Sequence, residues 1–259
     1  MTTTLADDLA TDPAAAPRDP RPGDADPRAV ARLSVVRMGV RVHVLTPQPL
    51  AVASEAALRA ELARCDARFH PGRPGSRVHR VLSGRLDAGE VGPRVRAVLA
   101  LAAGERDGAA MPDARTVAAV ALASTLERIG DLLDEAGLDD WHVAASGLVV
   151  QRGRDPRTGM AWTRRVVDPL RPGHVVDVDP GTGRTAVSTV LARPGADPVP
   201  SFDQVSVVGT SAVETLRTAW RVLDEGPSGL MLACADAQVC AIDPEGHVWA
   251  TGAFSPAAG

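Results

Sequence analysis

The segment that most constrains the fold runs from Thr116 to Arg152. Its first part has apolar residues at helical spacing with charged residues between them, which predicts an amphipathic helix. Gly137 is expected to end this helix, because glycine adopts the left-handed C′ conformation without a Cβ penalty. The helix therefore needs an apolar surface to cover. Its apolar positions are Val120, Leu126, Ile129, Leu132 and Leu133.

The residues after Gly137 predict that surface. The segment from Trp141 to Val150 is rich in β-branched and apolar residues, which favour strands. It is interrupted by four small residues, Ala144 to Gly147, and small residues let a backbone approach a ligand closely. We therefore expect a helix packed against two strands, with a candidate binding turn between the strands.

Length and composition exclude several classes of protein. The chain has 259 residues, enough for one large or two small domains, and 45% of them are hydrophobic, as in globular proteins. The net charge is -4 and no basic cluster is interleaved with aromatic residues, so we expect no nucleic-acid binding. Residues 1–28 lack apolar periodicity and predict a disordered acidic tail before a domain at 29–259.

The cysteines and the lengths of the apolar runs indicate in which cellular compartment the protein is expected. Cys65, Cys234 and Cys240 are too few and too scattered for a disulfide framework or a zinc site. A bridge between Cys234 and Cys240 is one alternative, and buried free thiols in a reducing cytoplasm are the expectation. No apolar run approaches the roughly 20 residues that span a bilayer, and no signal-peptide pattern is present. We expect a cytoplasmic protein without membrane insertion.

Other elements follow from the same patterns. A half-buried strand at Val40 to Val44 is entered through Met38-Gly39, and Ser54 is the expected N-cap of a helix that ends near Phe69. Asp179 to Gly183 is expected to be the loop of a hairpin. Further expected elements are a helix at 93–103, strands at 186–191 and 202–209, a helix at 211–223, and a hairpin joining 238–242 to 247–250.

The order of these landmarks resembles a known family. The runs Leu126-Glu127-Arg128, Asp131-Leu132-Leu133, Ala136-Gly137-Leu138 and Val143 to Gly147 are similar to the central segment of the FAD:protein FMN transferase (ApbE) family. Similar landmarks lie before this segment at 66–70 and after it at 185–189 and 202–209, so that the resemblance covers residues 35–254. It implies an α+β fold: a single ApbE-like (T-fold-like) domain of mixed, largely antiparallel sheets with packed helices.

The resemblance also implies site residues. Ala145, Ser146, Gly147 and Thr189 would lie near the flavin or its phosphates. In the family a helix presents Asp and, four residues later, Thr as oxygen ligands to magnesium. Those two positions are Glu214 and Thr218 here, and glutamate moves the carboxylate outward by one methylene. Residues 214 and 218 are therefore the implied magnesium ligands.

Three family motifs are absent. Leu122-Ala123 stands where a Lys-Gly pair is expected, and residues 104–110 replace a Thr-Gly-Gly-x-x-Asp segment. Asp113 is then expected to be a surface loop acid. Of a His-Ile-x-Asp-Pro-x-Thr-Gly loop only Asp197-Pro198 is present.

Two functions remain open. The first is a divergent FAD:protein FMN transferase, which uses magnesium and moves FMN from FAD to a threonine of an acceptor flavoprotein. The second is an inactive relative that binds flavin or a partner protein as a scaffold. The sequence contains no HExxH pair, G-x-S-x-G elbow or P-loop, and it singles out no catalytic residue.

Overall fold

The structure is a computed structural model that describes residues 30–103, 112–162, 164–167, 175–192, 200–252 and 254–256. The predicted tail at 1–28, the segment 104–110 and Asp197-Pro198 lie outside these residues. The described elements, in chain order, are β1 (Ala31–Arg37), β2 (Val40–Thr46), α1 (Val52–Phe69), α2 (Arg77–Leu82), α3 (Pro93–Ala103), α4 (Ala114–Glu135), β3 (Trp141–Ala145), β4 (Leu148–Arg152), β5 (Arg164–Val167), β6 (Val175–Val178), β7 (Thr185–Leu191), β8 (Gln204–Gly209), α5 (Ala212–Glu225), α6 (Pro227–Asp236), β9 (Gln238–Ile242), β10 (Val248–Ala250) and β11 (Phe254–Pro256).

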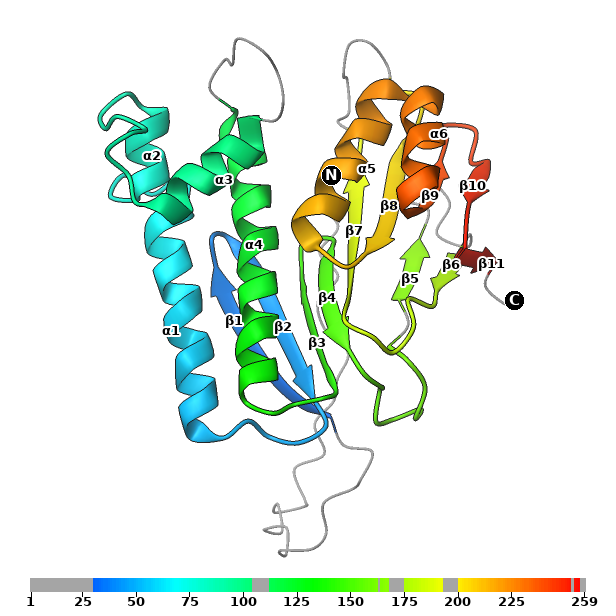
Figure 1. Ribbon diagram of the computed structural model, residues 1–259, viewed down its shortest axis with the longest axis horizontal. Coiled ribbons are helices and arrows are strands. Elements are labelled where there is room, and N and C mark those ends of the chain that lie inside the picture. The colour runs from blue at the N-terminus through cyan, green and yellow to red at the C-terminus, as the bar shows by residue number, and fades with distance from the viewer. Residues whose placement is uncertain are drawn as a thin grey trace, which may run out of the picture.

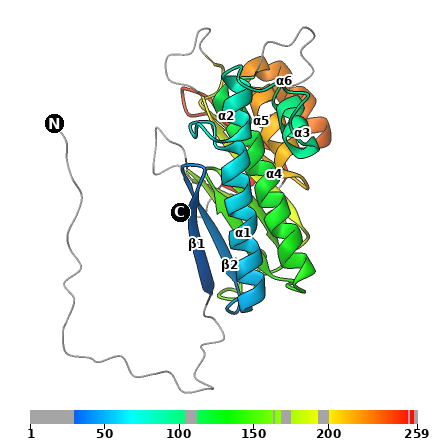
Figure 2. The same ribbon diagram turned by 90° about the vertical axis from the view of Figure 1, so that its left-hand side faces the viewer.

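An eight-stranded antiparallel sheet forms the centre of the molecule. Its strand order is β1-β2-β3-β4-β7-β8-β9-β10, and a second sheet has the order β11-β6-β5. Helices α1 and α4 lie over the β1 side of the large sheet, and α5 and α6 lie over its β7 to β9 side (Figure 1). The view from the side shows these helices in one layer (Figure 2). The α+β expectation is confirmed.

Alternate side chains of the strands point to opposite faces of the large sheet and form a hydrophobic core on each face. On β4, Val150 packs with the helices, whereas Val149 packs with residues of the small sheet such as Val178. Successive side chains of a strand point to opposite faces, so the small sheet covers the face opposite the helices. A third cluster joins α5 and α6 to β8 and β9 through residues such as Val207 and Ala219.

Two tight turns close the hairpins at one end of the large sheet. Met38 and Gly39 have φ values of 52° and 77°, and Ser146 and Gly147 have 45° and 83°. Positive φ at both central residues defines the type I′ turn, whose twist matches that of antiparallel strands. The expected break between β3 and β4 is therefore a two-residue turn.

Helix α4 begins two residues before the position that the sequence pattern suggested. The Asp113 carboxylate accepts hydrogen bonds from the backbone N–H groups of Arg115 (2.8 Å) and Thr116 (3.0 Å). Asp113 is thus an N-cap rather than a plain surface acid. Gly137 follows the last turn with φ at 76°, as predicted.

Two local predictions are wrong, and one helix was missed. Helix α1 begins at Val52 after Ala51, which makes no side-chain cap, so Ser54 lies inside the helix and is not its N-cap. Residues 179–183 do not close a hairpin, because β6 and β7 belong to different sheets. Helix α6 was not predicted at all. Its sequence is almost entirely apolar and small, so it has no helical alternation to detect.

All three cysteines are free thiols, as expected. Cys65 and Cys240 are buried and Cys234 is exposed, so the prediction of burial fails only for Cys234. Burial raises the pKa of the Cys240 thiol to about 12. Within the described ranges, none of the helices combines the length and apolar character needed to span a bilayer.

Candidate functional site

The candidate site lies where the β3–β4 hairpin ends before the neighbouring β7–β8 pair of strands does. The β3–β4 hairpin ends at the Ser146-Gly147 turn, and Leu148, the first residue of β4, pairs with Ser188. Strand β7 continues past that pair to Leu191, where it faces Gln204 at the start of β8. The short hairpin therefore leaves a notch in the sheet end beside the longer β7–β8 pair.

A cavity of about 750 Å³ occupies this notch. Its wall comes from the β1–β2 turn, the first half of α4, the β3–β4 turn, the ends of β7 and β8, and α5, with Val166 of β5 on the side of the small sheet. Most of the lining is apolar, which suits a flat organic ligand with few polar groups. The apolar wall includes Met38, Ala119, Leu122, Leu216 and Trp220.

Gly147 brings backbone directly to the floor of the cavity. Its carbonyl oxygen accepts a hydrogen bond from the Thr189 backbone N–H at 2.9 Å. A Cβ atom at position 147 would lie 2.5 Å from the Thr189 carbonyl oxygen, a separation that real Cβ atoms do not adopt. Only glycine therefore permits this approach of the turn to β7, which confirms a close-packed turn at the predicted place.

Few polar groups reach the cavity. Among the described residues that line it, Arg115 is the single charged one, and it is exposed in the first turn of α4. Gln204 also lines the cavity but is 3% exposed, and its Nε2 atom has no hydrogen-bond partner. The Thr189 hydroxyl pairs with the Ser206 hydroxyl at 2.9 Å. The site is thus an apolar hollow with a cation at its rim and an unpaired amide in its wall.

The structure brings three of the four implied flavin residues together. Ser146, Gly147 and Thr189 all line the cavity. Ala145 is 4% exposed and belongs to the core beneath the turn, so it supports the floor and does not line the cavity. Leu122, which stands where the resemblance expects Lys-Gly, lines the cavity as an apolar residue.

Glu214 and Thr218 do not converge on this cavity. They lie four residues apart on α5, and the α5 residues that line the cavity are Leu216 and Trp220. At 100° per residue, the two pairs point about 160° apart around the helix. The exposed Glu214 carboxylate is ion-paired with Arg217 at 3.2 Å. Carboxylate and hydroxyl oxygens suit magnesium chemically, but this pair does not fit a metal that faces the cavity.

Sequence reasoning missed how α5 is held against α4. Glu127 of α4 accepts a hydrogen bond from the Ser211 hydroxyl at 2.7 Å and from the Val213 backbone N–H at 3.3 Å. Ser211 in turn caps α5 by accepting from the Glu214 backbone N–H. The carboxylate thus sits at the positive end of the α5 dipole. Charged residues of an amphipathic helix are expected on its solvent-facing side, and nothing local in the sequence pairs Glu127 with residue 211.

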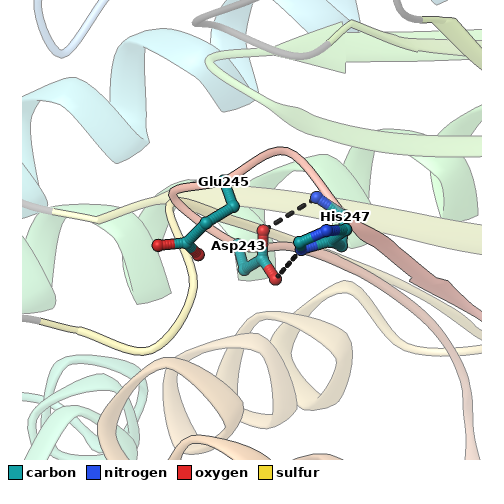
Figure 3. A group of neighbouring side chains, drawn as sticks. All are labelled: Asp243, Glu245 and His247. Carbon is teal, nitrogen blue, oxygen red and sulfur yellow. Dashed lines mark hydrogen bonds and ion pairs between the residues drawn. The ribbon is translucent and has the colours of Figure 1, made fainter.

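A separate group of side chains has the composition of a metal site. Asp243, Glu245 and His247 lie on the β9–β10 turn, with their potential ligand atoms within 4.8 Å of one another (Figure 3). The Asp243 carboxylate already accepts hydrogen bonds from the His247 backbone N–H at 2.7 Å and pairs with the His247 Nδ1 atom at 2.9 Å. None of the three lines the cavity, so they play no part in the site described above.

Comparison with solved structures decides the fold. The flavin transferase ApbE from Vibrio cholerae aligns with a TM-score of 0.66 and 13% identity, over 87% of this chain and 98% of that one. The chain has the ApbE fold. The Pseudomonas stutzeri flavinyl transferase ApbE in its apo form aligns with a TM-score of 0.64 and 18% identity, over 87% of this chain and 95% of that one. The ApbE protein from Thermotoga maritima aligns with a TM-score of 0.59 and 12% identity, over 86% of this chain and 97% of that one.

Sequence comparisons give no such match: no family model and no curated protein matches the chain. The ApbE likeness therefore rests on the arrangement of the elements. The single-domain α+β architecture that the order of landmarks implied is the one observed, despite identities of 12% to 18% with these three structures.

Proposed function

We propose that this chain binds FAD in the cavity beside the Ser146-Gly147 turn and acts as a flavin transferase. The observation that carries the proposal is the cavity itself, which lies within an ApbE fold and is lined by three residues implied to contact flavin. Its volume of about 750 Å³ is in the range of pockets that enclose cofactors. Its apolar wall can cover the faces of a planar ring.

The charge distribution favours a nucleotide over an uncharged ring compound. The single cation among the described lining residues, Arg115, is exposed at the start of α4. A guanidinium binds phosphate oxygens through charge-assisted hydrogen bonds. We place the ring against Leu122, Leu216 and Trp220, and the pyrophosphate near Arg115.

The proposed reaction moves FMN to a protein hydroxyl. A threonine oxygen of an acceptor flavoprotein forms a bond to the FMN phosphorus of FAD, the anhydride bond breaks, and AMP leaves with the bridging oxygen. The hydroxyl proton is released. The residues of this chain would bind the ring, orient the phosphates and limit access of water to the phosphorus. Among the described residues that line the cavity, no side chain has the chemistry of a general base, so we assign none.

A second candidate function is flavin binding without transfer. It is favoured by the position of Glu214, whose carboxylate pairs with Arg217 on a face of α5 that does not line the cavity. Magnesium held by Glu214 and Thr218 would supply charge neutralisation on the phosphates, and without it the bound FAD would remain intact. Assignment of the metal to these two residues stays a prediction.

Release of AMP from FAD separates the two functions. A transferase with magnesium at Glu214 is expected to release AMP only when magnesium is present, and Glu214→Ala should reduce the rate at least tenfold. Glu225→Ala is the control, because Glu225 is an exposed acid at the other end of the same helix. Chromatography of the nucleotides measures the rate. Saturable FAD binding without AMP release would favour the second candidate, and magnesium-dependent release that Glu214→Ala leaves unchanged would remove Glu214 from the metal site.

A further inference from the structure

Among the described residues that line the cavity, Gln204 has a buried polar atom without a hydrogen-bond partner. It is the first residue of β8, where its backbone pairs with Leu191 on one side and Ile242 on the other. The residue is 3% exposed and lines the cavity, and its Nε2 atom is buried without a hydrogen-bond partner. Buried amides are normally paired, because an unpaired donor loses its hydrogen bonds to water without replacement.

Two neighbouring hydroxyls pair with each other and not with the Gln204 Nε2 atom. Ser206 lies two residues further along β8 on the same face of the sheet, and its hydroxyl pairs with that of Thr189 at 2.9 Å. The described lining residues near this strip include the apolar Val166 and Leu191. A ligand that enters the cavity could therefore supply the hydrogen-bond acceptor that the Gln204 Nε2 atom lacks.

We propose that the Gln204 carboxamide recognises the imide edge of the flavin ring, in which an N–H group lies between two carbonyl oxygens. This inference rests on the proposed function, since it assigns a specificity residue to the same cavity. A carboxamide carries a donor NH₂ and an acceptor oxygen side by side. One donates to a ring carbonyl while the other accepts from the ring N–H. Rotation of the Gln204 carboxamide by 180° about its terminal torsion exchanges Oε1 and Nε2. The carboxamide can therefore pair with the ring edge in either orientation of the ring.

This pairing predicts which ligands the cavity rejects. Methylation of the ring N–H removes the donor and places a methyl group against the carboxamide, leaving a buried acceptor unpaired. A site that pairs buried polar groups with a ligand discriminates strongly against an analogue that lacks the matching group. Riboflavin and N3-methylriboflavin differ only at this position, and both lack the phosphates that Arg115 would bind.

The test is a cycle of two ligands and two proteins, measured by calorimetric or fluorescence titration. Wild-type protein is expected to bind riboflavin about tenfold or more tightly than N3-methylriboflavin. Gln204→Met keeps the length of the side chain and removes both polar atoms. It is expected to bind riboflavin about tenfold more weakly than wild type does, and to bind the two ligands with equal affinity. If the methionine variant does not fold, Gln204→Glu removes the donor at constant size, and the same loss of riboflavin affinity is expected.

Gln151→Met is the matched control. Gln151 is a buried glutamine whose Nε2 donates to the Trp162 carbonyl oxygen at 3.1 Å, and it does not line the cavity. This variant should keep the preference for riboflavin. Equal binding of both ligands by the wild-type protein, or an unchanged preference in Gln204→Met, would overturn the inference and leave the proposed function standing. Wild-type protein that binds neither riboflavin nor FAD would overturn both.

Discussion

Replacement of Gly147 by alanine is expected to destabilise the protein by about 3 kcal/mol or more and to abolish flavin binding. Two costs add at this residue. Its φ of 83° is unfavourable for any residue with a Cβ, and the new methyl group would lie 2.5 Å from the Thr189 carbonyl oxygen. Because that oxygen belongs to β7 in the centre of the sheet, the turn has to move away, and the cavity floor moves with it.

Gly137→Ala separates these two costs. Gly137 has a φ of 76°, and a Cβ there would meet no atom within 4 Å, so only the backbone cost of about 1–2 kcal/mol applies. Denaturant unfolding of both variants measures the difference, and titration with FAD measures binding. Equal destabilisation of the two variants would show that the contact between the β3–β4 turn and Thr189 is not tight.

Acidification is expected to remove stability that depends on Glu61. This α1 carboxylate is 5% exposed in its side chain and is bound by Arg94 and by Arg64, the latter at 2.7 Å. Burial alone would raise its pKa, but the two guanidinium groups outweigh burial and lower the pKa from 4.5 to about 2. The ionised form is thus favoured in the folded state, and the contribution is fully present above pH 4.5. It is lost as the pH falls from 4.5 towards 2, by roughly 3 kcal/mol at most.

Glu61→Gln should lose this pH dependence and should also be less stable near neutral pH, because Arg94, half-buried above Phe69, loses its charged partner. Glu55→Gln is the control on the same helix. Glu55 pairs with Arg59 at 2.7 Å, but both side chains are at least 40% exposed, so the pair contributes about 0–1 kcal/mol. Urea unfolding at pH 7 and at pH 3 measures both variants. A wild-type stability that is flat between pH 5 and pH 2 would contradict the assignment.

Local patterns in the sequence predict much of the fold. The apolar spacing around Leu126 and Ile129 predicts α4, and the small residues at Ser146-Gly147 predict the β3–β4 turn, because both signals are carried by neighbouring residues. The order of such elements was enough to identify the ApbE architecture. Elements without alternation or turn residues were missed, as with the uniformly apolar α6.

The site itself depends on contacts between distant residues. The hydrogen bond from Ser211 to Glu127 joins residues 84 positions apart, and the cavity wall combines Met38, Leu122 and Trp220. The unpaired Nε2 atom of Gln204 becomes evident only when its surroundings are placed around it. The three flavin residues implied by the resemblance that line the cavity lie in or beside the β3–β4 turn, and their contact with flavin stays a prediction. For Glu214 and Thr218 the resemblance gave the helix face, and the structure shows that a different face of α5 lines the cavity.

The central claim is that this cavity binds FAD. The most direct test is to fill the cavity with a large side chain and to measure FAD binding. Ala119 is half-buried on α4 and lines the cavity, whereas Ser124 is half-buried on the same helix and does not. We would titrate FAD into wild-type protein, Ala119→Trp and Ser124→Trp by calorimetry. Saturable one-to-one binding by the wild type and by Ser124→Trp, with a loss of at least a hundredfold in Ala119→Trp, is the expected result. Absence of FAD binding by the wild type, or equal binding by Ala119→Trp, would contradict the claim.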